Sequence, residues 1–380
     1  MSPDDMLDKA RALAPVLRER AFDTENARRI SDETINDLKS AGLFRLLQPA
    51  VYGGFEYDPQ VFMEAAMIIG AACPSTGWVY AVVGVHSWQL GLMPQQAQED
   101  VWGADRDVLI SSSYTPRGKV EIVDGGYRLN GRWSFSSGSD HAEWVILGGA
   151  ATEADGTVRR LCFLLPRTDY VVDDVWHVVG LRGTGSNDVV VDNAFVPQHR
   201  THPFTSGSVT SESPIYQLPF GSVFSFGITA PLLGAAQGAL DEHIAWTADR
   251  VRISKGSRVA EEPFSQVRVA EAAGELDGAR LQMMRDLDEM MALARDGKEI
   301  PIELRARSRL DQVRATQVAG SAVDRVFTNS GGRALHELNP IQRAWRDIHA
   351  GSLHNSNVAE PILMAYGALQ FGLSIADQGI

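Results

Sequence analysis

The period of the hydrophobic pattern changes twice along the 380-residue chain, near residue 108 and again near residue 206. Before the first change, apolar residues recur at helical spacing in 5–20. The segment 62–85 is rich in Ala, Ile and Val with few charges, which predicts a single helix buried on most sides. Between the changes, the apolar runs are short and separated by turn residues, which is typical of strands. After the second change, 268–295 and 302–327 again indicate long amphipathic helices. We therefore predict a mainly α protein of the α+β class with three domains, at 1–108, 109–205 and 206–380.

The middle segment contains a hairpin and further strands. The runs 120–123 and 127–129 flank Asp124-Gly125-Gly126, and such a turn between two apolar runs indicates a β-hairpin. Three more strands are expected at 144–147, 161–165 and 188–191. Their spacing predicts a small barrel or sandwich.

Two other local signals concern helices. Ser31 precedes Asp32 and Glu33, a pattern that predicts an N-terminal cap. The most apolar window, 224–240, is interrupted by Gly227, Pro231 and Gly234. We predict a buried helix there, because a membrane span needs about 20 consecutive apolar residues.

Charge and cysteine content narrow the class of protein. The formal net charge of −13 argues against nucleic acid or an anionic membrane surface as a partner. The first 19 residues mix charged and apolar side chains and lack the apolar core of a signal peptide. Cys73 and Cys162 are too few for a disulfide framework and suit a reducing compartment. We expect a cytoplasmic protein without a membrane segment or a metal site.

Several short motifs occur in a characteristic order. They are 41–47 with Pro49 and Gly53-Gly54, then 180–187 (GLRGTGSN), 195–197 and 343–347 (RAWRD). In this order the set resembles the acyl-CoA dehydrogenase superfamily over nearly the whole chain. The resemblance implies an N-terminal helical domain, a central β-barrel and a C-terminal four-helix bundle.

A second set of motifs resembles one branch of that superfamily. The segments 75–78, 101–103, 111–114 and 311–316 are similar to its flavin-dependent hydroxylases, and most of all to members that hydroxylate a phenolic secosteroid. These are oxygenase components of two-component monooxygenases. In the dehydrogenases, a bundle carboxylate removes a substrate proton. Here His354 and Asn355 stand in that region, and this departure argues against acyl-CoA oxidation.

The resemblance implies a specific reaction. A separate NAD(P)H-dependent reductase delivers reduced flavin, with FMN expected and FADH2 the alternative. The flavin reacts with O2 to a C4a-hydroperoxide, and its distal oxygen is transferred to the carbon ortho to a phenol oxygen, giving a catechol. The phenolic substrate expected is the 3-hydroxy secosteroid.

The resemblance also assigns catalytic roles. His86 and Ser112 correspond to residues that hold the phenol, Ser137 to a hydroxyl on flavin N5, and His354 to a histidine beside the isoalloxazine. Histidine suits a phenol base near neutral pH because its ordinary pKa is about 6.5. We favour His86 as that base, and which of the two histidines acts stays open.

The implied flavin contacts come from all three domains. They are Trp78, Ser112, Ser113, Tyr114, Phe135, Ser136 and Ser137 from the first two, and Arg250, Gly332, Arg333, His354 and Asn355 from the bundle. Arg250 and the Gly331-Gly332 turn are expected to come from a neighbouring subunit of a homotetramer.

Structural roles are the alternatives for the same residues. His86 could be a core histidine with a satisfied ring, and the serines at 111–113 could bond to backbone at a strand edge. The run 180–187 lacks the third glycine and the βαβ context of a dinucleotide loop, so we exclude a Rossmann site. Arg305, Arg307, Arg309 and Arg314 are expected to face solvent or another subunit. The alternative functions are an acyl-CoA dehydrogenase-like oxidoreductase with a relocated base, or an inactive tetrameric scaffold.

Overall fold

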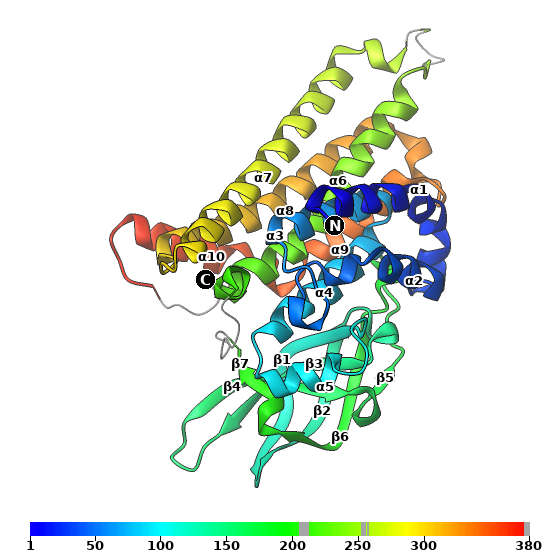
Figure 1. Ribbon diagram of the computed structural model, residues 1–380. Helices are drawn as coiled ribbons and strands as arrows, with labels where there is room; N and C mark the ends of the chain where they lie inside the picture. The colour runs from blue at the N-terminus through cyan, green and yellow to red at the C-terminus, as the bar shows by residue number, and fades with distance from the viewer. Residues whose placement is uncertain (205–212, 252–255, 257, 376–380) are drawn as a thin grey trace.

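The computed structural model describes residues 1–204, 213–251, 256 and 258–375. Its elements follow the predicted order of helices, strands and helices (Figure 1). The first helices are α1 (Pro3–Ala27), α2 (Asp32–Ala41), α3 (Pro59–Ala72), α4 (Pro74–Gly91) and α5 (Gln95–Trp102). The strands are β1 (Ile110–Val123), β2 (Gly126–Ser136), β3 (Trp144–Thr152), β4 (Val158–Pro166), β5 (Val171–Asp173), β6 (Asn187–Pro197) and β7 (Thr201–Pro203). The last helices are α6 (Phe220–Thr247), α7 (Pro263–Arg295), α8 (Ile302–Ser330), α9 (Pro340–Ser352) and α10 (Ala359–Gln370). The division into domains at 108 and 205 stays a proposal, and residues 205–212 lie outside the described part.

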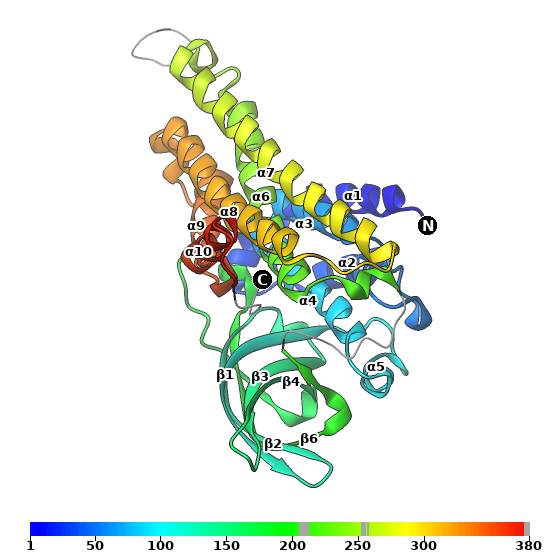
Figure 2. The ribbon, with the colours of Figure 1, turned by 90° about the vertical axis from the view of Figure 1, so that its left-hand side faces the viewer.

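The strands form one sheet in the order β5-β6-β2-β1-β3-β4-β7. The predicted hairpin is confirmed, with Val123 opposite Gly126 in the β1–β2 pair. All neighbouring strands are antiparallel except β1 and β3, which run parallel. The sheet curves around its own apolar cluster, which includes Trp133 and Phe163 (Figure 2). The barrel predicted from the strand spacing is therefore a strongly curved sheet of seven strands.

The N-terminal helices confirm one local prediction and correct another. The Ser31 hydroxyl accepts the N–H of Thr34 at 3.2 Å, as the capping pattern predicted. The single helix expected over 62–85 is instead two helices, separated at Cys73, whose backbone is extended with φ −148°. Pro74 explains the break, because proline has no N–H and disfavours the helical conformation of the residue before it.

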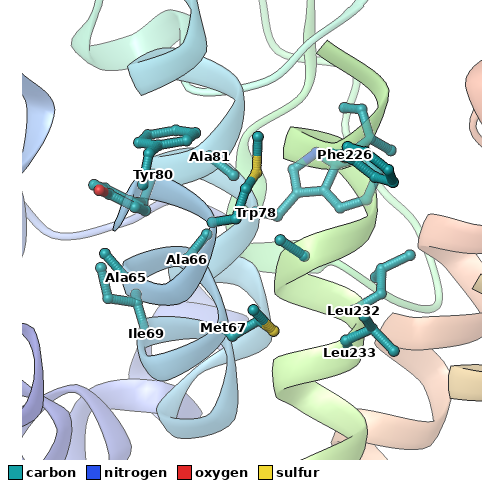
Figure 3. Close-up of a cluster of buried hydrophobic side chains, with 14 of the residues drawn as sticks. Ala65, Ala66, Met67, Ile69, Trp78, Tyr80, Ala81, Phe226, Leu232 and Leu233 are labelled. Carbon is teal, nitrogen blue, oxygen red and sulfur yellow. The ribbon is translucent and has the colours of Figure 1, made fainter. Parts of the chain in front are cut away.

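Helix α6 is the buried helix that the apolar window predicted. Within the part of the chain that the structure describes, it alone has the length and apolarity to cross a membrane, and 94% of that window is buried inside the protein. It packs against α3 and α4 (Figure 3). Gly234 permits this contact, because a Cβ atom there would lie 2.1 Å from the carbonyl oxygen of Met67. The window is therefore a core element that supports the site described below.

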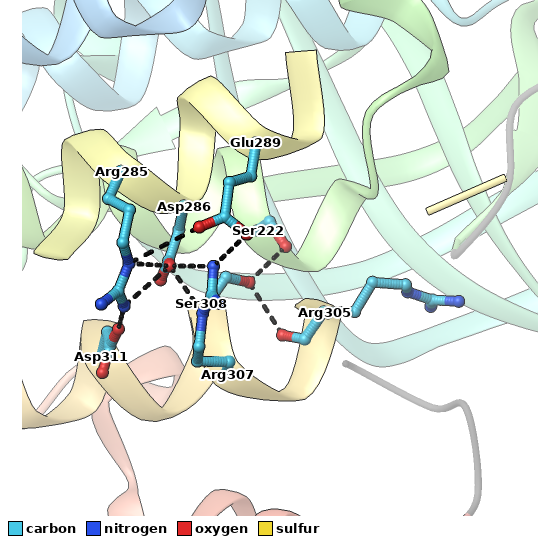
Figure 4. Close-up of polar contacts among 8 residues, drawn as sticks. All are labelled: Ser222, Arg285, Asp286, Glu289, Arg305, Arg307, Ser308 and Asp311. Atoms are coloured by element: carbon cyan, nitrogen blue, oxygen red, sulfur yellow. Dashed lines mark hydrogen bonds and ion pairs between the residues drawn. The ribbon is translucent and has the colours of Figure 1, made fainter. Parts of the chain in front are cut away.

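The arginines of α8 do not all face solvent or another subunit, although the sequence predicted this. Arg307 and Arg285 both donate to the fully buried carboxylate of Asp286, at 2.9 and 3.0 Å (Figure 4). Arg309 is only 5% exposed and donates to the carbonyl oxygen of Ser356 at 3.2 Å. Neighbouring elements cover α8 on more than one side. Arg307 therefore meets Asp286 of α7, whereas Arg309 meets Ser356, which follows α9. Arg314 is exposed, as expected.

Candidate active site

Three of the four residues assigned to catalysis converge where α4, the sheet and the bundle meet. The ring centre of Phe224 on α6 lies 6.4 Å from that of His86 and 6.3 Å from that of His354. The His354 ring is 5.8 Å from Trp78, whose indole N–H donates to the Ser137 hydroxyl at 3.1 Å. Phe224 and Trp78 thus join His86, His354 and Ser137 into one continuous cluster, although these residues come from three parts of the chain.

His86 is fully buried and its tautomer follows from its single partner. Its Nδ1 lies 2.7 Å from the carbonyl oxygen of Ile110, and a carbonyl can only accept, so Nδ1 carries the hydrogen. Nε2 is therefore an acceptor, and it is buried without a hydrogen-bond partner among the described residues. Burial lowers the pKa of His86 to about 4, so the ring is neutral at pH 7. An unpaired buried acceptor costs free energy that a ligand donor would recover.

The serine run at the start of β1 contributes in different ways. Ser113 donates to the carbonyl oxygen of Ser134 at 2.7 Å, which is the backbone role considered above. Ser112 is buried beside Tyr114. Burial raises the pKa of Tyr114 well above its usual value, and the Ser112 hydroxyl lowers that pKa by a smaller amount. The Tyr114 ring lies 6.2 Å from His86 and 5.3 Å from Phe224. Tyr114 is therefore part of the aromatic wall around His86.

A residue that the sequence reasoning missed holds Tyr114 in place. The Tyr114 hydroxyl donates to the side-chain oxygen of Gln89, one helical turn after His86. The Gln89 amide nitrogen lies 3.1 Å from Nε2 of His202, and His202 Nδ1 lies 2.6 Å from the carbonyl oxygen of Pro203. Gln89 and His202 are both buried. The available signal was the spacing between His86 and Gln89 on a buried helix.

A bulge at the end of β2 turns Ser136 and Ser137 inward together. Strand side chains normally alternate, so consecutive residues face opposite sides. Phe135 has φ +69°, and the register against β6 shifts between Trp133 and Ser136. Both serines are consequently buried, while Phe135 is 66% exposed beside Trp176. Bulges re-aim side chains in this way near active sites.

Ser137 belongs to a row of buried hydroxyls that the sequence reasoning also missed. Its Oγ lies 2.7 Å from Ser186 Oγ, which lies 2.6 Å from Thr184 Oγ1. Thr184 donates to the carbonyl oxygen of Leu181 at 2.8 Å. Both partners lie in the 180–187 motif, whose position in the resemblance was the only sequence signal for them.

His354 caps a short turn at the bundle side of the site. Its Nδ1 accepts the N–H of Ser356 at 3.1 Å, and Asn355 is exposed at the start of the turn Asn355–Asn357. Burial, with a smaller effect from the charge of Arg309, lowers the pKa of His354 to about 4. His354 is therefore a second neutral imidazole at pH 7.

Arg250, Gly332 and Arg333 lie at the other end of the bundle. Arg250 donates to the carbonyl oxygen of Ser330 at 2.9 Å, at the end of α8 where Gly332 begins the next turn. The helical rise separates Phe224 from Thr247 on α6 by about 35 Å. A single chain therefore does not bring these residues to the His86 cluster.

The cluster suits a flat heteroaromatic ring with polar edges. Aromatic side chains offer stacking surfaces, while Ser136 Oγ and Ser111 Oγ are buried without partners among the described residues. Unpartnered buried groups are rare in proteins and indicate a missing ligand or water. Two surface depressions of about 530 and 370 Å³ lie elsewhere, the first beside His199 and His202 and the second beside Asp140 and His141.

Comparisons with known proteins agree with this geometry. Residues 226–358 match the family model "Acyl-CoA dehydrogenase, C-terminal domain". The chain is 48% identical over 374 residues to the flavin-dependent monooxygenase, oxygenase subunit HsaA, of Rhodococcus jostii, covering 96% of this chain and 98% of that protein. It matches the crystal structure of 3-HSA hydroxylase from Rhodococcus sp. RHA1 with a TM-score of 0.95 at 46% identity, over 100% of both chains. It also matches XiaF from Streptomyces sp. in complex with FADH2 and glycerol, with a TM-score of 0.90 at 27% identity, covering 98% of this chain and 96% of XiaF.

The identity and coverage extend over nearly the whole chain, and the fold agrees over its full length. The alternative of an inactive scaffold loses its basis, because the neutral histidines and buried hydroxyls are brought together in one cluster. The chain belongs to the flavin-dependent monooxygenases of the acyl-CoA dehydrogenase fold and is the oxygenase component of a two-component system that uses reduced flavin.

Proposed function

We propose that the protein hydroxylates a bulky phenol ortho to its hydroxyl group, giving a catechol. The observation that carries this proposal is the buried, neutral His86, whose Nε2 has no partner among the described residues and lies in an aromatic cluster. The name of the 3-HSA hydroxylase supports a substrate of the same kind. We take the phenolic 3-hydroxy secosteroid as the first substrate to test.

His86 binds the phenol as a hydrogen-bond acceptor. Its Nδ1 hydrogen is committed to Ile110, so Nε2 takes the hydrogen bond from the phenol O–H. This bond draws the phenol proton toward the ring nitrogen and increases the electron density on the phenol oxygen and the ortho carbons. Ser112 holds the same oxygen from the β1 side. His86 is thus the phenol base of the pair, and His354 works on the flavin side.

Reduced flavin would supply the electrons that activate O2 when it is bound. Ser137 and Trp78 would hold its central ring edge, Ser136 would meet a further polar edge, and Tyr114 and Phe224 would exclude water from the ring face. His354, a neutral imidazole whose ring meets that of Trp78 edge to face at 5.8 Å, would contact the flavin from the bundle side. Exclusion of water protects reactive intermediates from side reactions and strengthens each polar contact in the site.

The partners follow from the same arrangement. An oxygenase component needs a separate reductase, and we propose an NAD(P)H-dependent flavin reductase that supplies reduced FMN. FADH2, as in the XiaF complex, is the competing cofactor. We also propose a homotetramer, because Arg250, Gly332 and Arg333 can reach a flavin phosphate only from another chain. The arginine fork suits such a phosphate through two charge-assisted hydrogen bonds.

The alternative of acyl-CoA oxidation with a relocated base has a specific candidate residue, Asp347 on α9. Its pKa is raised to about 7 by burial. However, its carboxylate accepts the N–H of Leu181 at 2.5 Å and so serves the backbone. We therefore do not assign it as a base.

The proposal is tested with reduced FMN, O2 and a series of phenols that includes the 3-hydroxy secosteroid. Catechol formation by the wild-type protein is the expected result, with His86→Asn lowering it strongly. If the protein releases only H2O2 with every phenol in the series, the proposed reaction is wrong.

A further inference from the structure

The row of hydroxyls behind Ser137 is sealed from solvent. Thr184, Ser186, Ser137 and Trp78 are 2%, 4%, 6% and 5% exposed. Their polar atoms follow one another at 2.6, 2.7 and 3.1 Å. Each hydroxyl has one hydrogen to donate, so the direction of the first bond determines the direction of the others.

The direction is set at Leu181. Its carbonyl oxygen can only accept, so the Thr184 hydroxyl uses its hydrogen there, at 2.8 Å. Thr184 Oγ1 can then only accept from Ser186, and Ser186 Oγ can only accept from Ser137. The Ser137 hydroxyl therefore donates its hydrogen to Ser186 and not to a ligand. Trp78 Nε1–H donates to Ser137 and occupies one of its two lone pairs.

The remaining lone pair gives Ser137 an acceptor face toward the ligand. Flavin N5 carries a hydrogen in reduced flavin and a lone pair in oxidised flavin. An acceptor suits the first and repels the second. The polarity of the row thus distinguishes the two redox states of the cofactor.

We propose that Ser186 and Thr184 are the residues that make this protein select reduced over oxidised flavin, by orienting the Ser137 hydroxyl as an acceptor. The inference rests on the proposed function in one respect, because it requires flavin N5 to lie beside Ser137. Ser186 and Thr184 act through Ser137 and are positioning residues.

Leu181, at the end of the row, is held in place by two further hydrogen bonds. Leu181 receives the indole N–H of Trp176 at 2.9 Å and gives its own N–H to Asp347 at 2.5 Å. Reversing the row to serve oxidised flavin requires the Thr184–Leu181 bond to break. One neutral hydrogen bond corresponds to a preference of about fivefold to tenfold.

The experiment measures the dissociation constants of the full-length protein for FMN in both redox states. Oxidised FMN is titrated in air and dithionite-reduced FMN without oxygen, and the ratio of the two constants is the readout. Ser186→Ala frees the Ser137 hydrogen to point at the ligand. Thr184→Val lets Ser186 donate to Ser137 instead. Both variants should bind oxidised FMN about fivefold to tenfold more tightly, with little change for reduced FMN.

Two further variants separate polarity from packing. Thr184→Ser keeps the hydroxyl and should keep the wild-type ratio. Ser139→Ala removes a buried hydroxyl of the same region that lies 3.5 Å from the carbonyl oxygen of Gly185, outside the row, and should also leave the ratio unchanged. Melting temperatures identify any variant that does not fold. If Ser186→Ala or Thr184→Val does not fold, the other of these two variants decides the test.

The inference is overturned if folded Ser186→Ala and Thr184→Val keep the wild-type ratio, or if both redox states weaken equally. A wild-type protein that forms catechol but has no preference for reduced FMN overturns the inference and leaves the proposed function standing. A wild-type protein that binds neither form overturns both.

Discussion

The carboxylate of Asp347 on α9 accepts the backbone N–H of Leu181, in the loop between β5 and β6, at 2.5 Å. This bond joins the bundle to the sheet immediately before the row that leads to Ser137. A side chain at Gly180 would clash here, since its Cβ would lie 2.2 Å from the carbonyl oxygen of Arg346. Helix α9 ends at Ser352, two residues before His354. One contact therefore sets the spacing between the two sides of the site.

Replacing Asp347 by Asn should change how stability depends on pH. Burial raises the folded-state pKa of Asp347 to about 7, above the value of about 4 in an unfolded chain. The folded protein therefore binds the extra proton between these values, and the contribution of Asp347 to stability falls as the pH rises from about 4 to about 7. The melting temperature of Asp347→Asn relative to wild type should increase over that range. A difference that is the same at pH 5 and pH 8 would contradict this.

His86 should impose an acid limit on activity well below neutral pH. Its pKa of about 4 keeps Nε2 available as an acceptor down to that region. We expect kcat/KM for the phenol to show no loss near pH 6.5 that is due to His86. His86→Asn should lower kcat/KM at pH 7 by about a hundredfold. If kcat/KM instead falls below about pH 6.5 and this fall disappears in His86→Asn, the His86 imidazole becomes charged near pH 6.5 in the free enzyme, and the prediction is wrong.

Gln89→Leu should loosen Tyr114 and weaken binding of the phenol. The substitution removes the acceptor of the Tyr114 hydroxyl, and KM for the phenol should rise by about tenfold. Combining it with Tyr114→Phe should add little, because both changes break the same bond. Gln98→Leu is the matched control, since Gln98 is buried on α5 and donates to the carbonyl oxygens of Met93 and Gly91. Equal KM changes for Gln89→Leu and Gln98→Leu would argue against this role.

Phe135→Gly should cost much less stability than Phe195→Gly. Phe135 has φ +69°, a left-handed conformation that costs a non-glycine residue about 1–2 kcal/mol. Phe195 lies in β6 opposite Arg128 and is also partly exposed. The two free energies of unfolding should differ by about 1–2 kcal/mol, measured by denaturant titration. Equal losses would mean that the bulge stores no such strain.

The fold was largely predictable because its signals are local. The helical stripes, the hairpin at Asp124-Gly125-Gly126 and the buried window at 224–240 each depend on neighbours in sequence. The same reasoning joined α3 and α4 into one helix, because the apolar pattern continues across Pro74. It also placed Arg309 among solvent-facing arginines, because a charge run does not reveal which elements cover each side of a helix.

The sequence by itself determined the order of elements, the family resemblance and the candidate residues His86, Ser112, Ser137 and His354. Only the tertiary structure decided that Phe224 and Trp78 join them, and that Gln89 and Ser186 support them. It also decided that Arg250 lies beyond the far end of α6, whose Thr247 is about 35 Å from Phe224. The physical reason is that hydrophobic period and turn chemistry act over a few residues. Hydrogen-bond direction and burial depend instead on partners that are distant in sequence and meet only when the chain is folded.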